Sequence, residues 1–301
     1  MSQKTVIIIT GPTASGKTDL AMHLARHFET SIISADSRQC FRELNIGVAK
    51  PSPGQLEEIH HYFVNSHSIK EEVNAAVFES LAIQACYEVL STRDAVIMSG
   101  GTGLYIKAFC EGLDEIPMID QEIRGNISTL YHQRGLDGLR DAIQQTDPLF
   151  YQSGEMSNPQ RMMRALEVVQ STGQSIMSFH KQEKKQRPFR ILEFGIRLPR
   201  KLLYQRINDR VDTMMDQGLL EEVTALLAVQ HLNALQTVGY AELFHYLQGK
   251  TTLDDAVSLI KQNTRHYAKR QNTWMNKNKN LVWLENDFLD QILLRYSNLK
   301  V

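Results

Sequence analysis

Residues 5–18 read TVIIITGPTASGKT, a short apolar run that ends in a glycine-rich turn, and they give the strongest indication of the fold class. The turn fits the pattern G-x-x-x-x-G-K-[ST] at every fixed position. Because an apolar run precedes it and helical spacing follows in residues 18–28, the turn lies between a strand and a helix. The eight residues of this phosphate loop are Gly11, Pro12, Thr13, Ala14, Ser15, Gly16, Lys17 and Thr18.

A loop of this kind binds the oxygens of a polyphosphate. Its glycines let backbone N–H groups converge on the anion, and the start of the following helix adds partial positive charge. We expect Lys17 to bring its charge to the outer phosphate and the hydroxyl of Thr18 to ligate Mg²⁺. The pattern does not distinguish ATP from a diphosphate ester, and a glycine-rich turn without a ligand is the alternative.

The first hundred residues alternate between strand and helix. Short apolar runs at 6–10, 31–35 and 95–99 predict strands, and residues 18–28 and 78–90 have helical periodicity. This alternation predicts a parallel sheet with helices on its faces.

From about residue 119 helical segments dominate without a clear strand, until residues 190–198 read as a strand again and everything after them reads as helical. The predicted fold class is therefore α/β, with a P-loop-type parallel sheet core, flanking helices and a mostly helical insertion domain. We assign residues 1–118 and 190–301 to the core with its helical C-terminal part, and residues 119–189 to the insertion. The longest predicted helical segments in these regions are 121–133, 136–145, 159–171, 202–215, 219–229 and 253–274.

Two further segments follow the predicted strands. Asp36 lies just past the second strand, and the sequence GGTG at 100–103 follows the third. Because ligands of doubly wound sheets bind outside the carboxyl ends of the strands, we expect both segments to border the phosphate loop. Asp36 can hold Mg²⁺ or act as a general base there, although a capping or turn aspartate is the alternative. The third strand ends in Ser99 and glycines rather than in an aspartate, which disfavours a standard ATPase.

The net charge of −1 conceals an uneven distribution of charge. Residues 156–210 contain 12 Lys or Arg against 4 Asp or Glu, and residues 261–279 contain 6 Lys or Arg and no acid. Two basic blocks favour a polyanion as partner. Solvated helix faces, or pairing with acidic faces elsewhere in the fold, are the alternatives.

Composition excludes several classes of protein. With 301 residues, 42% of them hydrophobic and 22% charged, the chain is typical of a globular protein rather than of a disordered or fibrous one. No apolar run approaches the roughly 18 residues of a membrane span, so we expect a cytoplasmic protein without a membrane partner. The 3 cysteines, and the adjacent His60 and His61, do not form the pattern of a zinc site.

Taken together, these motifs resemble those of one family, the bacterial tRNA dimethylallyltransferases, also called tRNA isopentenyltransferases. The phosphate loop alone is generic, whereas the ordered set spans nearly the whole chain. Three positions depart from the usual pattern: Phe41 and Val48 lack the hydroxyls of the usual Tyr and Thr, and Cys40 replaces an aliphatic residue. The matching segments are GPTASGKT at 11–18, SADSRQ at 34–39, IG at 46–47, AKP at 49–51, GGTGLY at 100–105, DP at 147–148, Asn158, QR at 160–161, RALEV at 164–168, QTVGY at 236–240, TR at 264–265, YAKRQ at 267–271 and TW at 273–274.

The resemblance implies transfer of a dimethylallyl group from dimethylallyl diphosphate to N6 of adenosine 37, beside the anticodon of tRNA, with release of diphosphate. An exocyclic amine is a poor nucleophile, and Asp36 is the candidate base for its proton. Lys17, the loop amides, and Thr18 with Mg²⁺ as cofactor would stabilise the charge on the leaving diphosphate.

The resemblance extends to the acceptor side. It implies that Thr102 lies near the acceptor and that an arginine of the segment 206–210, of which we favour Arg210, acts in catalysis. The partner is the anticodon stem-loop of tRNA, and we expect a monomer. The insertion at 119–189 is then the part that binds tRNA. For Arg161 and Arg164, a surface ion pair with Glu167, which is spaced i+3 from Arg164, is the alternative. The residues expected to contact tRNA are Asp36, Ser37, Arg38, Gln39, Thr102, Arg124, Gln160, Arg161, Met162, Met163 and Arg164.

Three other functions share part of these signals. A nucleoside or nucleotide kinase shares the phosphate loop, Mg²⁺ and the parallel sheet, and it predicts turnover of ATP. A prenyltransferase acting on free AMP shares the donor, but it needs neither a helical insertion nor the basic block at 261–279. The third is a nucleic-acid-binding protein in which the nucleotide loop only regulates the affinity for the nucleic acid. In such a protein Asp36 is dispensable.

Overall fold

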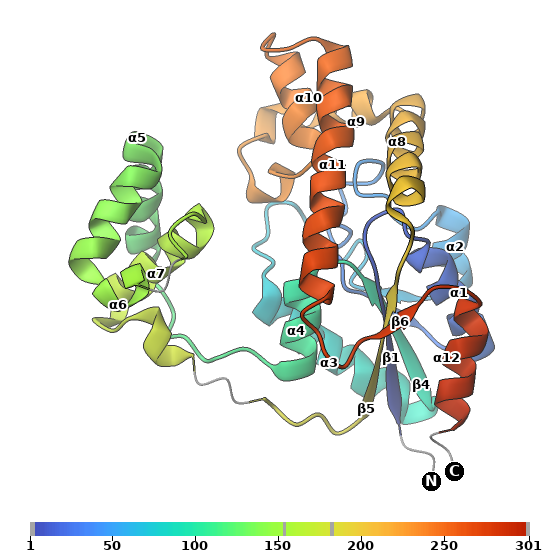
Figure 1. Cartoon of the computed structure of the whole chain (residues 1–301). Helices are drawn as coiled ribbons and strands as arrows, with labels where there is room; N and C mark the ends of the chain where they lie inside the picture. Colours follow the sequence, from blue (N-terminus) through green and yellow to red (C-terminus); the bar gives the residue numbers. More distant parts are fainter. Residues whose placement is uncertain (1–3, 153–154, 181–183, 299–301) are drawn as a thin grey trace. The chain divides into compact units, whose positions relative to one another are not determined.

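The computed structural model describes residues 4–152, 155–180 and 184–298, and the chain divides into two compact units (Figure 1). The ends of the second unit lie a few residues before those that we predicted for the insertion. Lys181 and Glu183 of the first basic block lie outside the described residues. Unit 1 comprises Met1–Cys110 and Gln186–Val301, and unit 2 comprises Glu111–Lys185.

Unit 1 is built on a six-stranded sheet in the order β3-β2-β4-β1-β5-β6. Every neighbouring pair is parallel, as predicted. The strand before the phosphate loop is flanked by β4 and β5, and β4 in turn lies beside β2, so the segments that follow β1, β2 and β4 meet at one edge. The strands are β1 (Thr5–Thr10), β2 (Ile32–Ser34), β3 (His61–Tyr62), β4 (Ala95–Gly100), β5 (Arg190–Ile196) and β6 (Val282–Leu284).

Helices cover both faces of this sheet, which is why β1 is nearly continuously apolar rather than alternating. Every residue of β1 is buried. Alternate residues of the strand, such as Ile7, pack in one cluster with α1 (Lys17–His27) and α12 (Phe288–Ser297). The opposite face is covered by α3 (Ala75–Thr92) and α4 (Gly103–Glu111) (Figure 1).

Two short strands were not predicted. β6 pairs with β5 so that Trp283 lies opposite Gly195, and the prediction that everything after residue 198 is helical is therefore wrong at this point. A three-residue strand is too short to show alternation, and its conformation depends on the neighbour with which it pairs. β3 is shorter still and pairs with β2 through Ile32 and Ile33.

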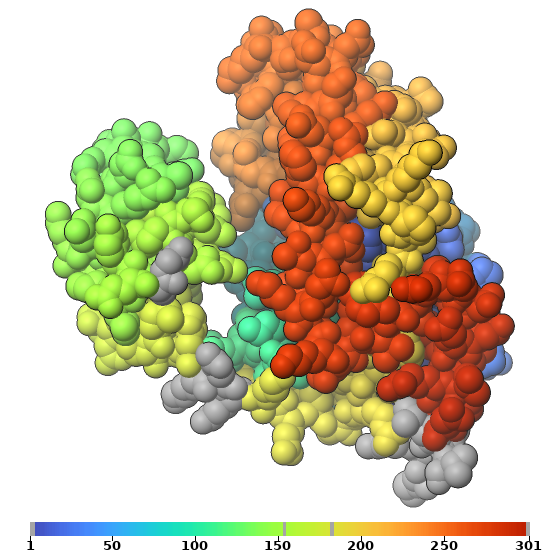
Figure 2. Space-filling model, viewed as in Figure 1, coloured from blue at the N-terminus to red at the C-terminus, as the bar shows by residue number. Residues whose placement is uncertain are grey.

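Helices of the C-terminal part lie over the carboxyl edge of the sheet (Figure 1). The last of them, α11, forms a ridge on one face of unit 1, drawn in orange to red in Figure 2. Its final turn reaches β1, where the hydroxyl of Thr10 donates a hydrogen bond to Sδ of Met275 at 3.5 Å. This helix therefore brings residues from late in the chain to the phosphate loop. The helices concerned are α8 (Arg200–Asp216), α9 (Leu219–Ala225), α10 (Tyr240–Leu247) and α11 (Leu253–Met275); unit 1 also contains α2 (Pro53–Glu58) and the 3₁₀ turns Leu227–Val229 and Asn233–Leu235.

Unit 2 is helical and has a hydrophobic core of its own. Gly135, at φ 60°, interrupts α5, so this element is two consecutive helical segments, as the sequence pattern predicted. Met162 is 0% exposed in the core of the unit. The prediction that it contacts tRNA is wrong for its side chain, because this position of α7 faces the core. The elements of the unit are α5 (Gln121–Thr146), α6 (Pro148–Gln152), α7 (Pro159–Thr172) and the 3₁₀ turn Ile176–Phe179.

Two kinds of feature are missing from the part of the chain that the structure describes. None of its helices combines the length and the apolar composition needed to cross a membrane. None of its clusters of three or more His, Cys, Asp or Glu side chains could hold a metal ion. The Nδ1 atom of His61 is hydrogen-bonded to the carbonyl of Ile59 at 2.7 Å.

Candidate active site at the carboxyl edge of the sheet

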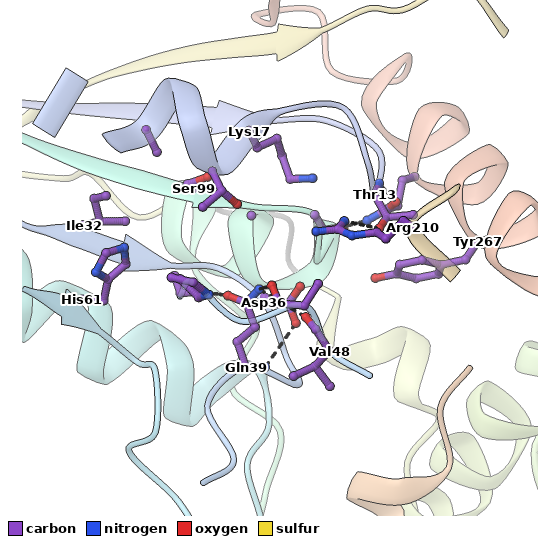
Figure 3. A pocket seen from close by; sticks show the side chains of 18 residues that line it. Thr13, Lys17, Ile32, Asp36, Gln39, Val48, His61, Ser99, Arg210 and Tyr267 are labelled. Atoms are coloured by element: carbon purple, nitrogen blue, oxygen red, sulfur yellow. Dashed lines mark hydrogen bonds between the residues drawn. The ribbon is translucent and has the colours of Figure 1, made fainter. Parts of the chain in front are cut away.

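A pocket lies where the segments after β1, β2 and β4 meet (Figure 3). Figure 3 shows Lys17 from α1, Asp36 from the segment after β2 and Arg210 from α8 around one space. The structure thus brings together side chains that the sequence separates by up to nearly two hundred residues. The predicted residues that line this pocket are Thr13, Lys17, Thr18, Asp36, Gln39 and Arg210.

The phosphate loop has the geometry of an anion cradle. Gly16, at φ 90°, turns the chain into α1, a conformation that residues with a Cβ rarely adopt. At Gly11 a Cβ would lie 2.6 Å from Oγ of Ser15, so the loop closes tightly. The buried hydroxyl of Ser15 has no hydrogen-bond partner among the described residues. Buried polar groups are almost always satisfied, and a ligand oxygen would satisfy this one.

Two partly buried cations face the loop. Lys17 donates a hydrogen bond to the carbonyl of Pro12 at 2.8 Å, and Arg210 donates one to the hydroxyl of Thr13 at 3.3 Å. Burial, and then repulsion by Arg210, lowers the pKa of Lys17 to about 8, against the attraction of Asp36. Burial also lowers the pKa of Arg210. A partly buried site with two cations and one carboxylate is suited to a bound anion, because a negative charge offsets both the burial of the cations and their mutual repulsion.

Asp36 is held in one orientation by its own loop. Its Oδ1 accepts hydrogen bonds from the N–H groups of Arg38 at 2.9 Å and of Gln39 at 3.4 Å. The carboxylate therefore takes part in an aspartate turn, the alternative raised from the sequence, and it also lines the pocket. A fixed carboxylate beside an anion site can accept a proton from a group that reacts there.

Thr102 connects the second glycine turn to the Asp36 loop. Its hydroxyl accepts a hydrogen bond from the N–H of Ser37 at 3.1 Å and contacts the hydroxyl of the same residue at 3.4 Å. It also shares a hydrogen bond with Tyr267 of α11. Burial, and then the carboxylate of Asp36, raises the pKa of Tyr267 to about 12, so the phenol is protonated at neutral pH.

Tyr267 and Gln271 line the pocket but were not among the predicted site residues. They lie four positions apart on α11, so they share one face of the helix. Both belong to the segment YAKRQ, which carried the family resemblance and was the available signal. The sequence did not indicate that the face of α11 with Tyr267 and Gln271 lies against the phosphate loop.

The positions that depart from the family pattern lie in or next to the pocket. Val48 lines it, and the side-chain amide of Gln39 donates hydrogen bonds to the carbonyls of Val48 at 3.3 Å and of Ala49 at 3.0 Å. Phe41 and Cys40 are buried. Cys40 therefore packs as an aliphatic residue would.

The remaining predicted contacts belong to unit 2. Arg161 pairs with Glu155 at 2.6 Å, and Arg164 pairs with Glu167 at 3.0 Å, the ion pair that the spacing suggested. Arg124 lies 3.9 Å from the same carboxylate of Glu167. Gln160 is exposed and Met163 is partly buried against the core of the unit. α7 thus presents charged side chains at its N-terminal end, already paired with acids.

A magnesium ion at this site would take few ligands from the protein. The hydroxyl of Thr18 and the carboxylate of Asp36 are oxygen donors that line the pocket. Mg²⁺ usually keeps several waters and binds one or two protein oxygens together with phosphate oxygens. These two oxygens match the one or two that the protein would supply to a Mg²⁺ ion bound together with phosphate groups.

The chain matches the family model described as IPP transferase over residues 39–278. It is 42% identical over 297 residues to tRNA dimethylallyltransferase 1 of Bacteroides thetaiotaomicron, covering 98% of this chain and 96% of that protein. Among solved structures it is similar to the full-length tRNA isopentenylpyrophosphate transferase of Bacillus halodurans, with a TM-score of 0.71 and 30% identity over 98% of this chain and 95% of that one. A eukaryotic dimethylallyltransferase acting on tRNA shares the fold with a TM-score of 0.80 at 24% identity, over 98% of this chain and 79% of that one. The chain therefore belongs to the IPP transferase family, the family of the tRNA dimethylallyltransferases.

Proposed function

We propose that this protein transfers a dimethylallyl group from dimethylallyl diphosphate to N6 of adenosine 37 in tRNA and releases diphosphate. The observation that carries the proposal is the placement of Asp36 beside the two cations of the phosphate-loop pocket, in a chain of this family. That arrangement provides an anion site and a base within one cavity, which the reaction requires.

The donor diphosphate binds in the phosphate loop. Backbone N–H groups, Lys17 and Arg210 surround its oxygens, and they stabilise the negative charge that grows on the diphosphate as the C–O bond to the prenyl group breaks. When bound through Thr18, Mg²⁺ supplies further positive charge at the leaving group. The same interactions orient the donor so that its C1 carbon faces Asp36.

The acceptor amine attacks C1 while the diphosphate departs with the electrons of the broken C–O bond. A C–N bond forms, and the proton of the amine passes to the carboxylate of Asp36. Because Oδ1 is already engaged by two backbone N–H groups, the second oxygen is the better placed to take this proton. General base catalysis of this kind typically contributes about 10²–10⁴-fold to the rate.

Adenosine 37 must leave its stack to reach the pocket. Thr102 and Ser37, in the segments that follow β4 and β2, contact each other next to Asp36, and their hydroxyl groups can read the edge of the base. The exposed cations of unit 2 are suited to the phosphates of the stem-loop. We further propose that the enzyme works as a monomer in the cytoplasm, where its tRNA substrate is found.

The experiment that tests the function is one set of parallel incubations. Radiolabelled dimethylallyl diphosphate and Mg²⁺ are supplied with unmodified tRNA, with AMP, and with tRNA in which adenosine 37 is replaced by guanosine. We expect label only in the first tRNA. Label in AMP supports the free-adenylate prenyltransferase instead, and phosphorylation of nucleosides in a parallel reaction with ATP supports a kinase.

A further inference from the structure

One wall of the pocket is formed by a loop that the sequence analysis did not assign to the site. Residues 45–51 follow the Asp36 loop and contribute Val48, Ala49 and Pro51 to the lining. Ala21 and Ile32 add further apolar groups to the lining, which also contains the cations Lys17 and Arg210. Figure 3 shows Val48 close to Gln39 and Asp36. The pocket therefore offers both cations for a diphosphate and apolar side chains for a hydrocarbon group.

This loop is held by one carboxylate from a distant helix. Oε2 of Glu222, on α9, accepts hydrogen bonds from the N–H groups of Asn45 at 3.0 Å and of Ile46 at 2.9 Å. Its Oε1 accepts a third from the N–H of Gly47 at 3.1 Å. Hydrogen bonds to an ionised acceptor are about twice as strong as neutral ones. Three consecutive N–H groups on one carboxylate leave the loop little freedom.

Tyr240 of α10 also holds this loop, because it contacts both Glu222 and Gly47. Its hydroxyl donates a hydrogen bond to Oε1 of Glu222 at 2.5 Å. The ring is wholly buried, and a Cβ at Gly47 would lie 2.5 Å from one of its carbons. Burial and the neighbouring carboxylate both raise the pKa of Tyr240, so the phenol keeps its proton. The loop therefore rests directly on the ring, with no room for movement toward it.

The other end of the loop is constrained as well. Ala49 has φ 48°, in the left-handed region that residues with a Cβ rarely adopt, and the side chain of Gln39 bonds its carbonyl. A strained backbone conformation of this kind persists only where several surrounding interactions hold it in place. Glu222 holds residues 45–47, and Gln39 holds the carbonyls of Val48 and Ala49, so the segment whose apolar side chains line the pocket is fixed at both ends.

We propose that Glu222 is a positioning residue that sets the size of the prenyl group accepted by the enzyme, because it holds Val48 and Ala49 against the hydrocarbon of the donor. This inference rests on the proposed prenyl transfer. An apolar pocket of fixed size discriminates against an added or missing methylene group by about 10–200-fold. If the wall can withdraw, the fit to a five-carbon chain weakens and the penalty against a longer chain falls.

The test compares two donors, dimethylallyl diphosphate and the ten-carbon geranyl diphosphate, in the full-length protein. Glu222→Ala, Glu222→Gln and Tyr240→Phe are measured beside Glu221→Ala. Glu221 is the exposed neighbour on the same helix and serves as the matched control. For each variant, kcat and KM with tRNA are determined for both donors, and calorimetry gives the dissociation constant of each donor without tRNA.

We expect Glu222→Ala to raise KM for dimethylallyl diphosphate by about ten-fold with a smaller change in kcat, and to lower the preference for the shorter donor by about ten-fold. Glu222→Gln and Tyr240→Phe should shift the preference in the same direction by less, and Glu221→Ala should leave it unchanged. A proportional loss for both donors, with the preference intact, would mean that Glu222 only supports the fold and would overturn the inference.

Two controls keep the outcomes apart. If Glu222→Ala does not fold, as judged by its thermal unfolding, the milder Glu222→Gln and Tyr240→Phe variants decide through the same ratio. If the parent protein binds dimethylallyl diphosphate but transfers nothing to tRNA, the proposed function fails. The dissociation constants of the two donors then still test whether Glu222 sets the size of the space for the hydrocarbon group.

Discussion

Gln271 of α11 accepts a hydrogen bond from the backbone N–H of Thr13 in the phosphate loop, at 2.8 Å. The same side chain donates a hydrogen bond to the carbonyl of Gly101 at 2.9 Å, and the close approach leaves no space for a Cβ at that glycine. One buried amide thus joins two glycine-rich turns that follow different strands. The active-site geometry of the N-terminal region depends on a residue from the last part of the chain.

Replacement of Gln271 by alanine should therefore destabilise the protein and loosen the donor site. It leaves the N–H of Thr13 and the carbonyl of Gly101 without their partner, at a cost of about 1–3 kcal/mol for an unsatisfied buried group. Urea unfolding measures the loss in stability, and KM for dimethylallyl diphosphate should rise. Gln262→Ala, at an exposed position of the same helix, should change neither quantity. An equal midpoint for the two variants would contradict the bridging role.

Asp36→Asn separates the chemical role of this residue from its structural one. The amide oxygen of asparagine can still accept the hydrogen bonds of Arg38 and Gln39, so the turn is retained. The base is lost, and kcat should fall by about 10²–10⁴-fold. Affinity for tRNA, measured by filter binding, should stay within a few-fold of the parent. A variant that turns over at nearly the parental rate would remove Asp36 from the chemistry.

Arg210 and Arg206 lie one turn apart on α8, and their roles should differ. Arg210 is within hydrogen-bond distance of Thr13 in the phosphate loop, whereas Arg206 is exposed. Loss of a charged donor at the leaving group costs about 10²–10³-fold in kcat, and we expect this for Arg210→Ala. Arg206→Ala should stay within a few-fold of the parent. Single-turnover rates with saturating donor check the comparison, and equal losses would assign the role to the segment as a whole.

Donor affinity should fall at alkaline pH. Burial lowers the pKa of Lys17 to about 8, so above that pH a growing share of the free enzyme lacks the charge that meets the diphosphate. The dissociation constant should be constant below this value and approach a ten-fold rise per pH unit above it, as for loss of one proton. Calorimetric titrations at several pH values measure this profile.

A second lysine requires a control in that experiment. Burial also lowers the pKa of Lys50 to about 8, and its ammonium bonds the carbonyl of Phe41 at 2.6 Å. Lys50→Arg should keep the alkaline loss of affinity, since its charge persists at all pH values tested. In Lys17→Ala the affinity should be weak throughout and the inflection absent. Retention of the inflection in Lys17→Ala would assign it to another group.

Joint truncation of Arg161 and Arg164 should weaken tRNA binding and flatten its dependence on salt. Both side chains are paired with acids in the free protein, with Glu155 and Glu167, so each must exchange that partner for a phosphate. Each phosphate contact contributes roughly 0.7–0.9 to the slope of log affinity against log salt, and the double variant should lose about one or two such units. Arg134→Ala, which removes another exposed pair of unit 2, is the control. An unaltered slope would leave the two arginines as surface ion pairs.

Local sequence determined the parts of this protein that depend on a few neighbouring residues. The apolar run before Gly11, and the glycines and Lys17 after it, define a strand, a phosphate loop and a helix without reference to the rest of the chain. The placement of Asp36 at the site followed from one general rule, that segments after parallel strands meet at one edge of the sheet. Gly135 likewise divided α5 as the pattern predicted.

Tertiary structure alone decided the rest. β6 exists because β5 offers it an edge, and Met162 is buried because α7 packs on α5 rather than exposing that face. Gln271 and Glu222 accept hydrogen bonds from loops more than a hundred residues away. The local sequence around either residue does not indicate which loop it contacts. Hydrogen bonds and packing between distant segments depend on which elements the whole fold brings together. A local pattern records only what its own few residues favour.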